Sequence, residues 1–193
     1  MQRMRDRSDE EQLAIHVDNN LAPVWEVDHR PRIDRVRRYI DAAIASFDRP
    51  VTIIDLGVGS GDTSGRYSDT HRVIGIDITD DSRRVCADRF PRMEHILSPV
   101  ETAPVEDCDI LVACEVLEHL ASPVQSYRRF ADRSTAVVIG HPLDEPDPSS
   151  ELFHLWRYGM DDFKAWFTDH PLVDYDVFAM GGFPQMIVGW GKR

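Results

Sequence analysis

A glycine-rich turn after a short apolar run constrains the fold of this chain more than any other stretch. Residues 51–61 read VTIIDLGVGSG, in which a β-branched run ends at Asp55 and glycines follow at positions 57, 59 and 61. Such a run is typical of a buried parallel strand that leads into a ligand-binding loop. Glycines let the backbone approach a ligand closely and adopt conformations that a Cβ atom forbids. The sequence therefore predicts a parallel sheet with a ligand at the end of this strand.

The spacing of the glycines argues against the two commonest phosphate-binding loops. A dinucleotide fingerprint needs a third glycine at position 62, where this chain has Asp62, and no GK[ST] follows as a P-loop requires. A helix that began at Asp62 would place a carboxylate where a pyrophosphate binds. The loop therefore suits a nucleoside ligand without phosphates, preferably a cationic one.

The rest of the chain predicts an α/β fold. Apolar runs that end at turn-forming residues alternate with stretches of helical periodicity, which indicates a parallel sheet. The expected strands are 72–78, 93–98, 108–114 and 135–140, and the expected helices are 31–47, 62–69, 80–90, 122–132 and 160–168. A hairpin through Gly181-Gly182 completes the chain. We expect a Rossmann-like, seven-stranded, mostly parallel sheet with an antiparallel C-terminal hairpin strand and helices on both faces, formed by residues 31–193 after an N-terminal extension, 1–30.

Composition limits the partners. The 193 residues suffice for one domain. No apolar run approaches the roughly 20 residues of a membrane span, and the charged start lacks the apolar core of a signal peptide, so we expect a cytoplasmic protein without a membrane partner. The net charge of −12 makes a nucleic-acid partner unlikely, although five arginines cluster within 30–38. We interpret that cluster as a solvated helix face, and we expect a monomer or a homodimer.

An acidic residue at the end of the second strand supports a nucleoside ligand. Asp77 lies 20 positions after Gly57. In Rossmann-like sheets an acid at about this distance binds the hydroxyls of a ribose. Asp77 is therefore the candidate ribose ligand.

Three motifs together resemble those of class I S-adenosylmethionine-dependent methyltransferases. They are IDLGVGSG, GIDIT around Asp77, and DILVACEVLEHL, which is similar to the small-molecule subgroup that includes ubiquinone-pathway O-methyltransferases. The resemblance spans roughly 31–193 and implies S-adenosylmethionine as cofactor and a small-molecule acceptor, such as a metabolite, sugar or natural product, methylated on oxygen or nitrogen. The cofactor-binding residues that it implies are Asp55, Gly57, Gly59, Gly61, Asp77, Ile78, Ser98, Val100, Cys114 and Glu115.

Two histidines are candidate catalytic bases. His119 follows the fourth strand and His141 follows the fifth, so both are expected at the ligand edge of the sheet. An imidazole near its ordinary pKa suits proton abstraction from an oxygen or nitrogen acceptor.

The same region also suggests a metal. Glu115, Glu118 and His119 form an ExxEH pattern on one helical turn, and His154 follows 35 positions after His119. Two carboxylates and two imidazoles can hold a divalent cation such as Mg²⁺. The pattern is similar to the metal site of small-RNA 2′-O-methyltransferases that act on the 3′-terminal ribose, but ExxEH also occurs in ubiquinone-type enzymes. A metal-assisted RNA methyltransferase and a non-catalytic cofactor-binding protein therefore stay open as alternatives.

Overall fold

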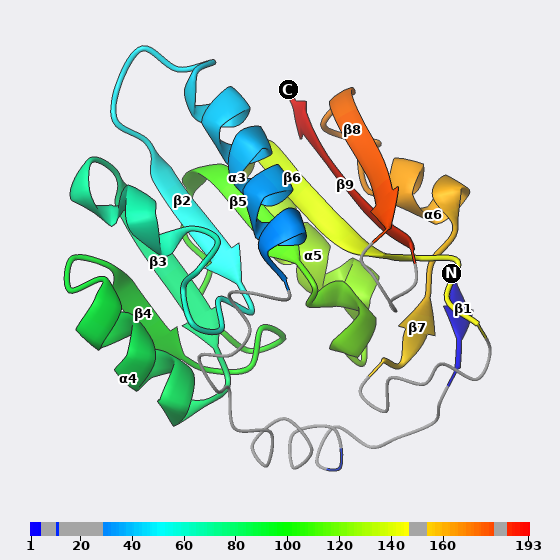
Figure 1. The fold of residues 1–193 in the computed structure, drawn as a ribbon, viewed down its shortest axis with the longest axis horizontal. Helices are drawn as coiled ribbons and strands as arrows, with labels where there is room; N and C mark the ends of the chain where they lie inside the picture. The colour runs from blue at the N-terminus through cyan, green and yellow to red at the C-terminus, as the bar shows by residue number, and fades with distance from the viewer. Residues whose placement is uncertain (5–10, 12–28, 147–153, 180–184) are drawn as a thin grey trace.

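A computed structural model describes residues 1–4, 11, 29–146, 154–179 and 185–193 (Figure 1). Its main sheet has seven strands in the order β4-β3-β2-β5-β6-β9-β8. The strands are β2 (Thr52–Leu56), β3 (Arg72–Asp77), β4 (Glu94–Leu97), β5 (Cys108–Cys114), β6 (Ser134–Leu143), β8 (Leu172–Ala179) and β9 (Gln185–Lys192). All neighbours from β4 to β6 run parallel, whereas β9 pairs antiparallel with both β6 and β8. The predicted fold class is confirmed.

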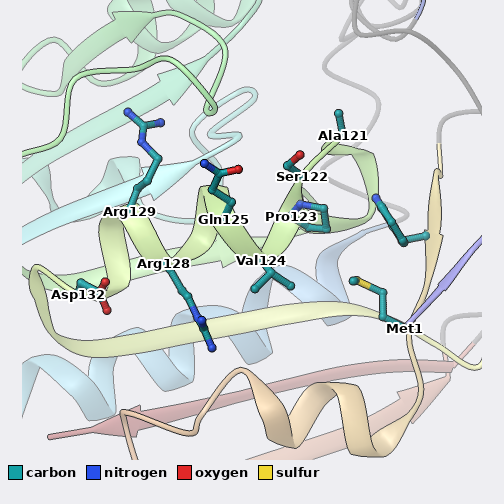
Figure 2. Close-up of a pocket in the computed structure, with 10 residues that line it drawn as sticks. Met1, Ala121, Ser122, Pro123, Val124, Gln125, Arg128, Arg129 and Asp132 are labelled. Atoms are coloured by element: carbon teal, nitrogen blue, oxygen red, sulfur yellow. The ribbon is translucent and has the colours of Figure 1, made fainter.

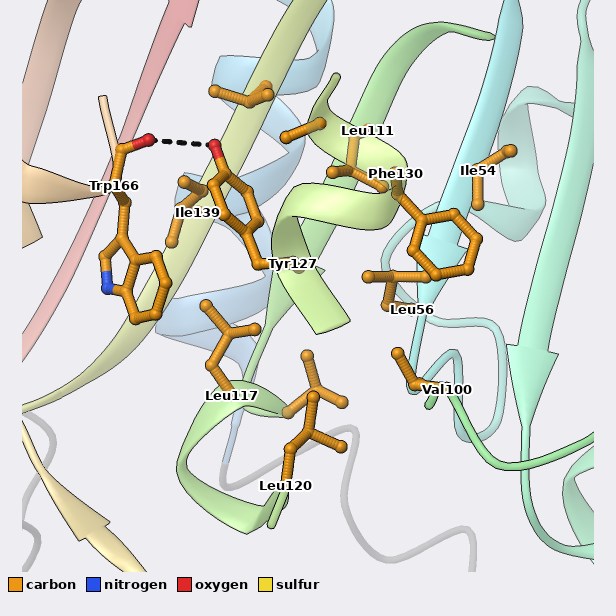
Figure 3. Packing of buried hydrophobic residues seen from close by; sticks show 14 of the residues in the cluster. Ile54, Leu56, Val100, Leu111, Leu117, Leu120, Tyr127, Phe130, Ile139 and Trp166 are labelled. Carbon is orange, nitrogen blue, oxygen red and sulfur yellow. Dashed lines mark hydrogen bonds between the residues drawn. The ribbon is translucent and has the colours of Figure 1, made fainter. Parts of the chain in front are cut away.

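Helices cover both faces of this sheet. They are α3 (Arg30–Ile44), α4 (Asp80–Arg89), α5 (Pro123–Ala131) and α6 (Met160–Ala165), with 3₁₀ turns η1 (Gly65–Asp69) and η2 (Leu117–His119). Because successive strand residues face opposite sides, Ile53 packs in the cluster that contains α3, and Ile54 packs in the cluster that contains α5. Figure 3 shows Tyr127 and Phe130 of α5 against the second of these clusters. The Tyr127 hydroxyl donates to the carbonyl of Trp166 at 2.9 Å, which joins α5 to the end of α6.

Four elements differ from the sequence-based prediction by three residues at one end. The helix expected at 31–47 ends at Ile44. The helix expected at 62–69 is the shorter η1, because the chain turns through Gly61 at a φ of +76° before it. The helix expected at 160–168 ends at Ala165. The strand expected at 135–140 continues to Leu143, because His141, Pro142 and Leu143 pair with residues of β9.

The N-terminal part of the chain is described only in pieces. Strand β1 (Gln2–Arg3) pairs antiparallel with β7 (Trp156–Arg157) in a separate two-stranded sheet. Helix α3 begins at Arg30, close to the predicted domain start at residue 31. Most of the predicted extension and the predicted Gly181-Gly182 hairpin lie outside the described residues. Among the helices that are described, none has the length and apolar character needed to cross a membrane.

Candidate functional site

The glycine turn follows β2 at the carboxyl edge of the sheet, where β3 and β5 also end. Gly57, Gly59 and Gly61 all have positive φ, but their surroundings differ. A Cβ atom at Gly57 would lie 2.8 Å from Cγ2 of Val116, whereas a Cβ atom at Gly59 would meet no heavy atom of the described structure within 4 Å. Gly57 therefore packs against the protein, and Gly59 faces open space. This is the kind of space that a ligand held close to the backbone would fill.

Asp77 lies beside that space, as the spacing predicted. The backbone N–H of Gly59 donates to Oδ2 of Asp77 at 2.9 Å. Oδ1 accepts from the backbone N–H of Thr79 at 3.0 Å and from its hydroxyl at 2.9 Å. A carboxylate has about four lone-pair sites, so these three bonds leave capacity for a further donor. Asp77 thus both fixes the loop and presents an acceptor at its edge.

Asp55 and Asp62 have structural partners. Asp55 is buried and accepts from the Ser64 hydroxyl at 2.6 Å, and its burial raises its pKa to about 7. Asp62, which prevents a dinucleotide fingerprint, forms an ion pair with Arg89 of α4 at 2.5 Å. Arg37 of α3 donates to the Asp62 carbonyl. These contacts join the loop to α3 and α4, and neither contact was predicted from the sequence.

The residues expected near a nucleobase follow β3 and β4. The backbone N–H of Ser98 donates to the carbonyl of Asp77 at 2.9 Å, which brings the two loops together. Ile78 and Ser98 are half-buried. Val100 is buried in the cluster that also contains Leu56 (Figure 3). Ile78 and Ser98 therefore lie next to Asp77, and Val100 lies in the core cluster beside the end of β2.

Cys114 ends β5 and Glu115 follows it, and the backbone of Glu115 is strained. Its φ is 58°, a conformation that non-glycine residues seldom adopt and that tends to occur at functional sites. Its backbone N–H donates to the carbonyl of Gly140 at 2.9 Å. Its carboxylate lies 2.9 Å from the guanidinium of Arg32 in α3. Burial raises the pKa of Glu115, and the charge of Arg32 opposes that rise.

Glu118, His119 and His154 come together next to Glu115. One ligand atom of each lies within 4.8 Å of the others. Glu118 is fully buried, and its two carboxylate oxygens have no hydrogen-bond partner in the part of the chain that the structure describes. Burial is the main cause that raises its pKa to about 8, and the charge of Glu115 adds to the effect. Glu118, His119 and His154 therefore lie together, whereas Glu115, the fourth residue of the predicted metal set, is not part of this group and pairs with Arg32.

Glu145, which the sequence analysis did not single out, orients His154. Nδ1 of His154 lies 2.7 Å from Oε2 of Glu145, and both side chains are buried. Burial by itself would lower the pKa of His154, but the hydrogen bond to Glu145 and the nearby carboxylates outweigh it and raise the pKa to about 9. The rings of His119 and His154 make an edge contact, with centroids 4.8 Å apart. The pairing leaves Nε2 of His154 as the atom available to the cluster.

The expectation that His141 faces the ligand edge needs correction. His141 is fully buried because β6 continues past it along β9. Its Nδ1 lies 2.9 Å from the carbonyl of Pro142, and its ring packs on Tyr158 at a centroid distance of 4.6 Å. Burial lowers its pKa to about 4. His141 is therefore a neutral core residue at ordinary pH, out of contact with solvent.

Comparisons with known proteins agree with this geometry. Residues 54–133, which include the glycine turn, Asp77 and the ExxEH pattern, match the family described as a methyltransferase domain. This stretch of the chain is similar to a methyltransferase domain. Among curated proteins, none matches the sequence significantly.

Solved structures resemble the chain over nearly its whole length. The 1,6-didemethyltoxoflavin-N1-methyltransferase of Burkholderia thailandensis is 16% identical, with a TM-score of 0.71 over 98% of this chain and 92% of that one. Magnesium protoporphyrin IX methyltransferase from Synechocystis is 11% identical, with a TM-score of 0.72 over 98% and 100%. The N-methyltransferase NodS from Bradyrhizobium japonicum is 13% identical, with a TM-score of 0.72 over 95% and 97%. These likenesses establish the class I methyltransferase fold.

A cavity of about 610 Å³ lies along α5 of this methyltransferase fold (Figure 2). It is lined by Met1, Ala121, Ser122, Pro123, Val124, Gln125, Arg128, Arg129, Asp132 and Trp156. None of these residues belongs to the glycine turn or to the Glu118 cluster. Trp156 lines the cavity, whereas Tyr158 is buried and donates to the carbonyl of Leu117 at 2.9 Å. The cavity is thus separate from the residues expected to bind the cofactor.

The arginine cluster of α3 is largely paired rather than free. Arg32 binds Glu115 and Arg37 binds the Asp62 carbonyl, so both join α3 to the candidate site. Arg38 lies 2.8 Å from Asp176 of β8, and Arg35 lies 3.9 Å from the same carboxylate. The face of α3 that was predicted to be solvated therefore forms ion pairs and hydrogen bonds with β8 at the sheet edge and with the loops of the candidate site.

Proposed function

We propose that this protein is an S-adenosylmethionine-dependent methyltransferase that acts on an oxygen or nitrogen atom of a small molecule. The observation that carries the proposal is the open space at Gly59 beside Asp77, inside a methyltransferase domain. Two of the similar structures support it. One contains 1,6-didemethyltoxoflavin with S-adenosylhomocysteine, and the other contains S-adenosylmethionine in a porphyrin methyltransferase. A ubiquinone-type acceptor is compatible with this proposal.

The residues around Gly59 fit the cofactor. Asp77 has acceptor capacity for the ribose hydroxyls, and Ile78, Ser98 and Val100 are the candidates for contact with the adenine. Gly57, Gly59 and Gly61, with Asp55 behind them, would surround the methionine part, and Cys114 and Glu115 close that side. When bound, S-adenosylmethionine supplies a methyl group activated on a sulfonium cation. The protein then has to orient the acceptor and take up its proton.

His119 is the better candidate base of the two histidines. It is the last residue of η2, which follows the carboxyl end of β5, and it is only partly buried, whereas His141 is buried in the core. Its contact with the His154 ring fixes its position beside Glu118. We therefore propose that His119 accepts the acceptor's proton and that His141 has a structural role.

Calorimetry with S-adenosylhomocysteine tests the cofactor assignment. The wild-type protein should bind it, and Asp77→Ala should bind at least about tenfold more weakly, since it loses hydrogen bonds to a charged acceptor and an anchor of the loop. Asp69→Ala, at the end of η1, is the control and should bind as the wild type does. Absence of binding to the wild-type protein would remove the proposal. Binding without turnover over a broad acceptor panel would instead favour a non-catalytic cofactor-binding protein.

One observation favours a second candidate, a divalent-metal-assisted 2′-O-methyltransferase acting on the 3′-terminal ribose of RNA. The ligand atoms of Glu118, His119 and His154 lie together, and the Glu118 oxygens lack described partners. A carboxylate that orients a ligating imidazole, as Glu145 orients His154, is common in metal sites. Two observations count against this candidate. The net charge is −12, and several arginines of α3 are already paired with acids.

A titration with Mg²⁺ and Mn²⁺ separates the two candidates. The metal-assisted candidate requires binding of either cation that Glu118→Ala abolishes, together with loss of activity on chelation. If neither cation gives a heat of binding and chelators do not change the activity, the small-molecule proposal is left. A cytoplasmic location and a monomeric or homodimeric state remain predictions.

A further inference from the structure

We propose that Ser82 and His95 are positioning residues for the cofactor loop and that they act through the carbonyl of Gly59. The proposal rests on the proposed function, because it assigns their effect to cofactor affinity. Ser82 lies in α4 and His95 in β4, so neither belongs to the glycine turn that they would control. No motif in the sequence connects the three residues.

The peptide groups on both sides of Gly59 are held by other parts of the chain. The Gly59 N–H donates to Asp77. The Gly59 carbonyl accepts a hydrogen bond of 2.5 Å from the Ser82 hydroxyl and a weaker one of 3.3 Å from the Cys86 thiol. Gly59 is also the loop glycine whose α-carbon faces open space. The orientation of this residue therefore determines the shape of the wall that the cofactor would contact.

The position of Ser82 is itself fixed. Its side chain is fully buried, and its backbone N–H donates to the hydroxyl of Thr79 at 3.2 Å, the capping bond of α4. Its hydroxyl has one hydrogen, which the Gly59 carbonyl takes, so the hydroxyl oxygen must accept from Nε2 of His95 at 3.1 Å. The position of His95 thus constrains the Ser82 hydroxyl, which in turn constrains the Gly59 carbonyl.

This arrangement determines the tautomer of His95. The proton must be on Nε2, and Nδ1 is buried without a hydrogen-bond partner in the described structure. A neutral ring with its one proton on Nε2 satisfies both conditions. Burial lowers the pKa of His95, in keeping with a neutral ring.

The expected consequence is a loop that holds its binding conformation before the cofactor arrives. Pre-organisation of a binding loop raises affinity because the ordering entropy is not lost on binding. Removal of the Ser82 hydroxyl should therefore weaken cofactor binding. It should leave turnover at saturating cofactor unchanged, because neither residue lies at the acceptor side of the site.

The test compares matched variants by calorimetry with S-adenosylhomocysteine and by initial rates. Ser82→Ala and His95→Leu should each weaken binding by about 3- to 10-fold, the effect of one lost hydrogen bond. His95→Gln should stay close to wild type, because its amide N–H can replace Nε2–H as donor to Ser82. Ser68→Ala is the control, since that hydroxyl donates to the carbonyl of Gly65 at 2.8 Å outside the loop.

The outcomes distinguish this proposal from the one on which it rests. If the wild-type protein does not bind S-adenosylhomocysteine, the proposed function fails. If the wild type binds and Ser82→Ala and His95→Leu bind equally well, the positioning role is overturned. The role is also overturned if turnover at saturating cofactor falls as much as affinity does. Should Ser82→Ala fail to fold, the comparison of His95→Leu with His95→Gln decides, and equal affinities would again contradict the proposal.

Discussion

A methyl group added at Gly59 should impair cofactor binding much more than it impairs folding. Gly59 has a φ of +53°, and a Cβ atom there would meet no described heavy atom within 4 Å. The substitution Gly59→Ala therefore incurs the cost of a left-handed conformation, about 1–2 kcal/mol, without a clash. In a chain of 193 residues this corresponds to a fall in melting temperature of about 2–8 °C.

Binding should respond differently because the added methyl group enters the space assigned to the cofactor. If the crowding resembles that of an overpacked core, it costs about 1–3 kcal/mol, or about 5- to 150-fold in affinity. Calorimetry with S-adenosylhomocysteine measures this loss, and thermal unfolding measures the stability of the same samples.

Gly57→Ala is the matched comparison. Its φ is +66°, and its Cβ atom would lie 2.8 Å from Cγ2 of Val116. Backbone strain and steric overlap together should cost about 2–5 kcal/mol of stability. A folded Gly59→Ala protein that binds S-adenosylhomocysteine as tightly as the wild type would refute the placement of the cofactor at Gly59. Equal destabilisation by the two substitutions would refute the contrast in their surroundings.

Three further predictions concern the supports of the site. The pKa of His141 is about 4 in the fold and about 6.5 when unfolded, so its contribution to stability is complete above pH 6.5. On the order of 3 kcal/mol of the free energy of unfolding is then lost as the pH falls from 6.5 through 4. His141→Gln should reduce this pH dependence in urea unfolding, and an unchanged pH dependence would contradict the assignment. Tyr158→Phe removes the shorter of the two hydrogen bonds to the Leu117 carbonyl and leaves only the 3.4 Å bond from the backbone N–H of Leu120, so it should lower the free energy of unfolding by about 1–2 kcal/mol. An effect near zero would show that the bond is unimportant. Arg89→Met removes the ion-pair partner of Asp62 and should lower the free energy of unfolding by about 1–3 kcal/mol in the same assay. High salt should lower the stability of the wild type more than that of the variant, and the opposite result would argue against a charge effect.

Local sequence signals predicted the parallel sheet and the edge of it at which the candidate site lies. Apolar runs identified β2, β3 and β5 because buried parallel strands are almost continuously apolar. Asp77 was predicted from its distance from Gly57 in the sequence. Gly57 follows β2 and Asp77 ends the neighbouring parallel strand β3, so both lie at the same edge of the sheet. Both inferences depend on residues that are close in the sequence.

Partners that are distant in the sequence could not be predicted in this way. Arg32 meets Glu115, and His95 reaches Gly59 through Ser82, only because the fold places their elements side by side. His141 was wrongly expected at the ligand edge because the strand seemed to end before it. Pairing with β9, more than 40 residues later in the chain, extends that strand and buries the histidine.

The position of β9 has a consequence for how the protein is made. Strand β9 lies between β6 and β8 in the sheet, yet it follows both in the chain. During synthesis β8 therefore leaves the ribosome before the strand with which it pairs, and the antiparallel half of the sheet has to wait for β9. The parallel strands β2 to β6 emerge before β8 and β9 and can begin to assemble, so the glycine turn belongs to the part of the sheet that is synthesised first.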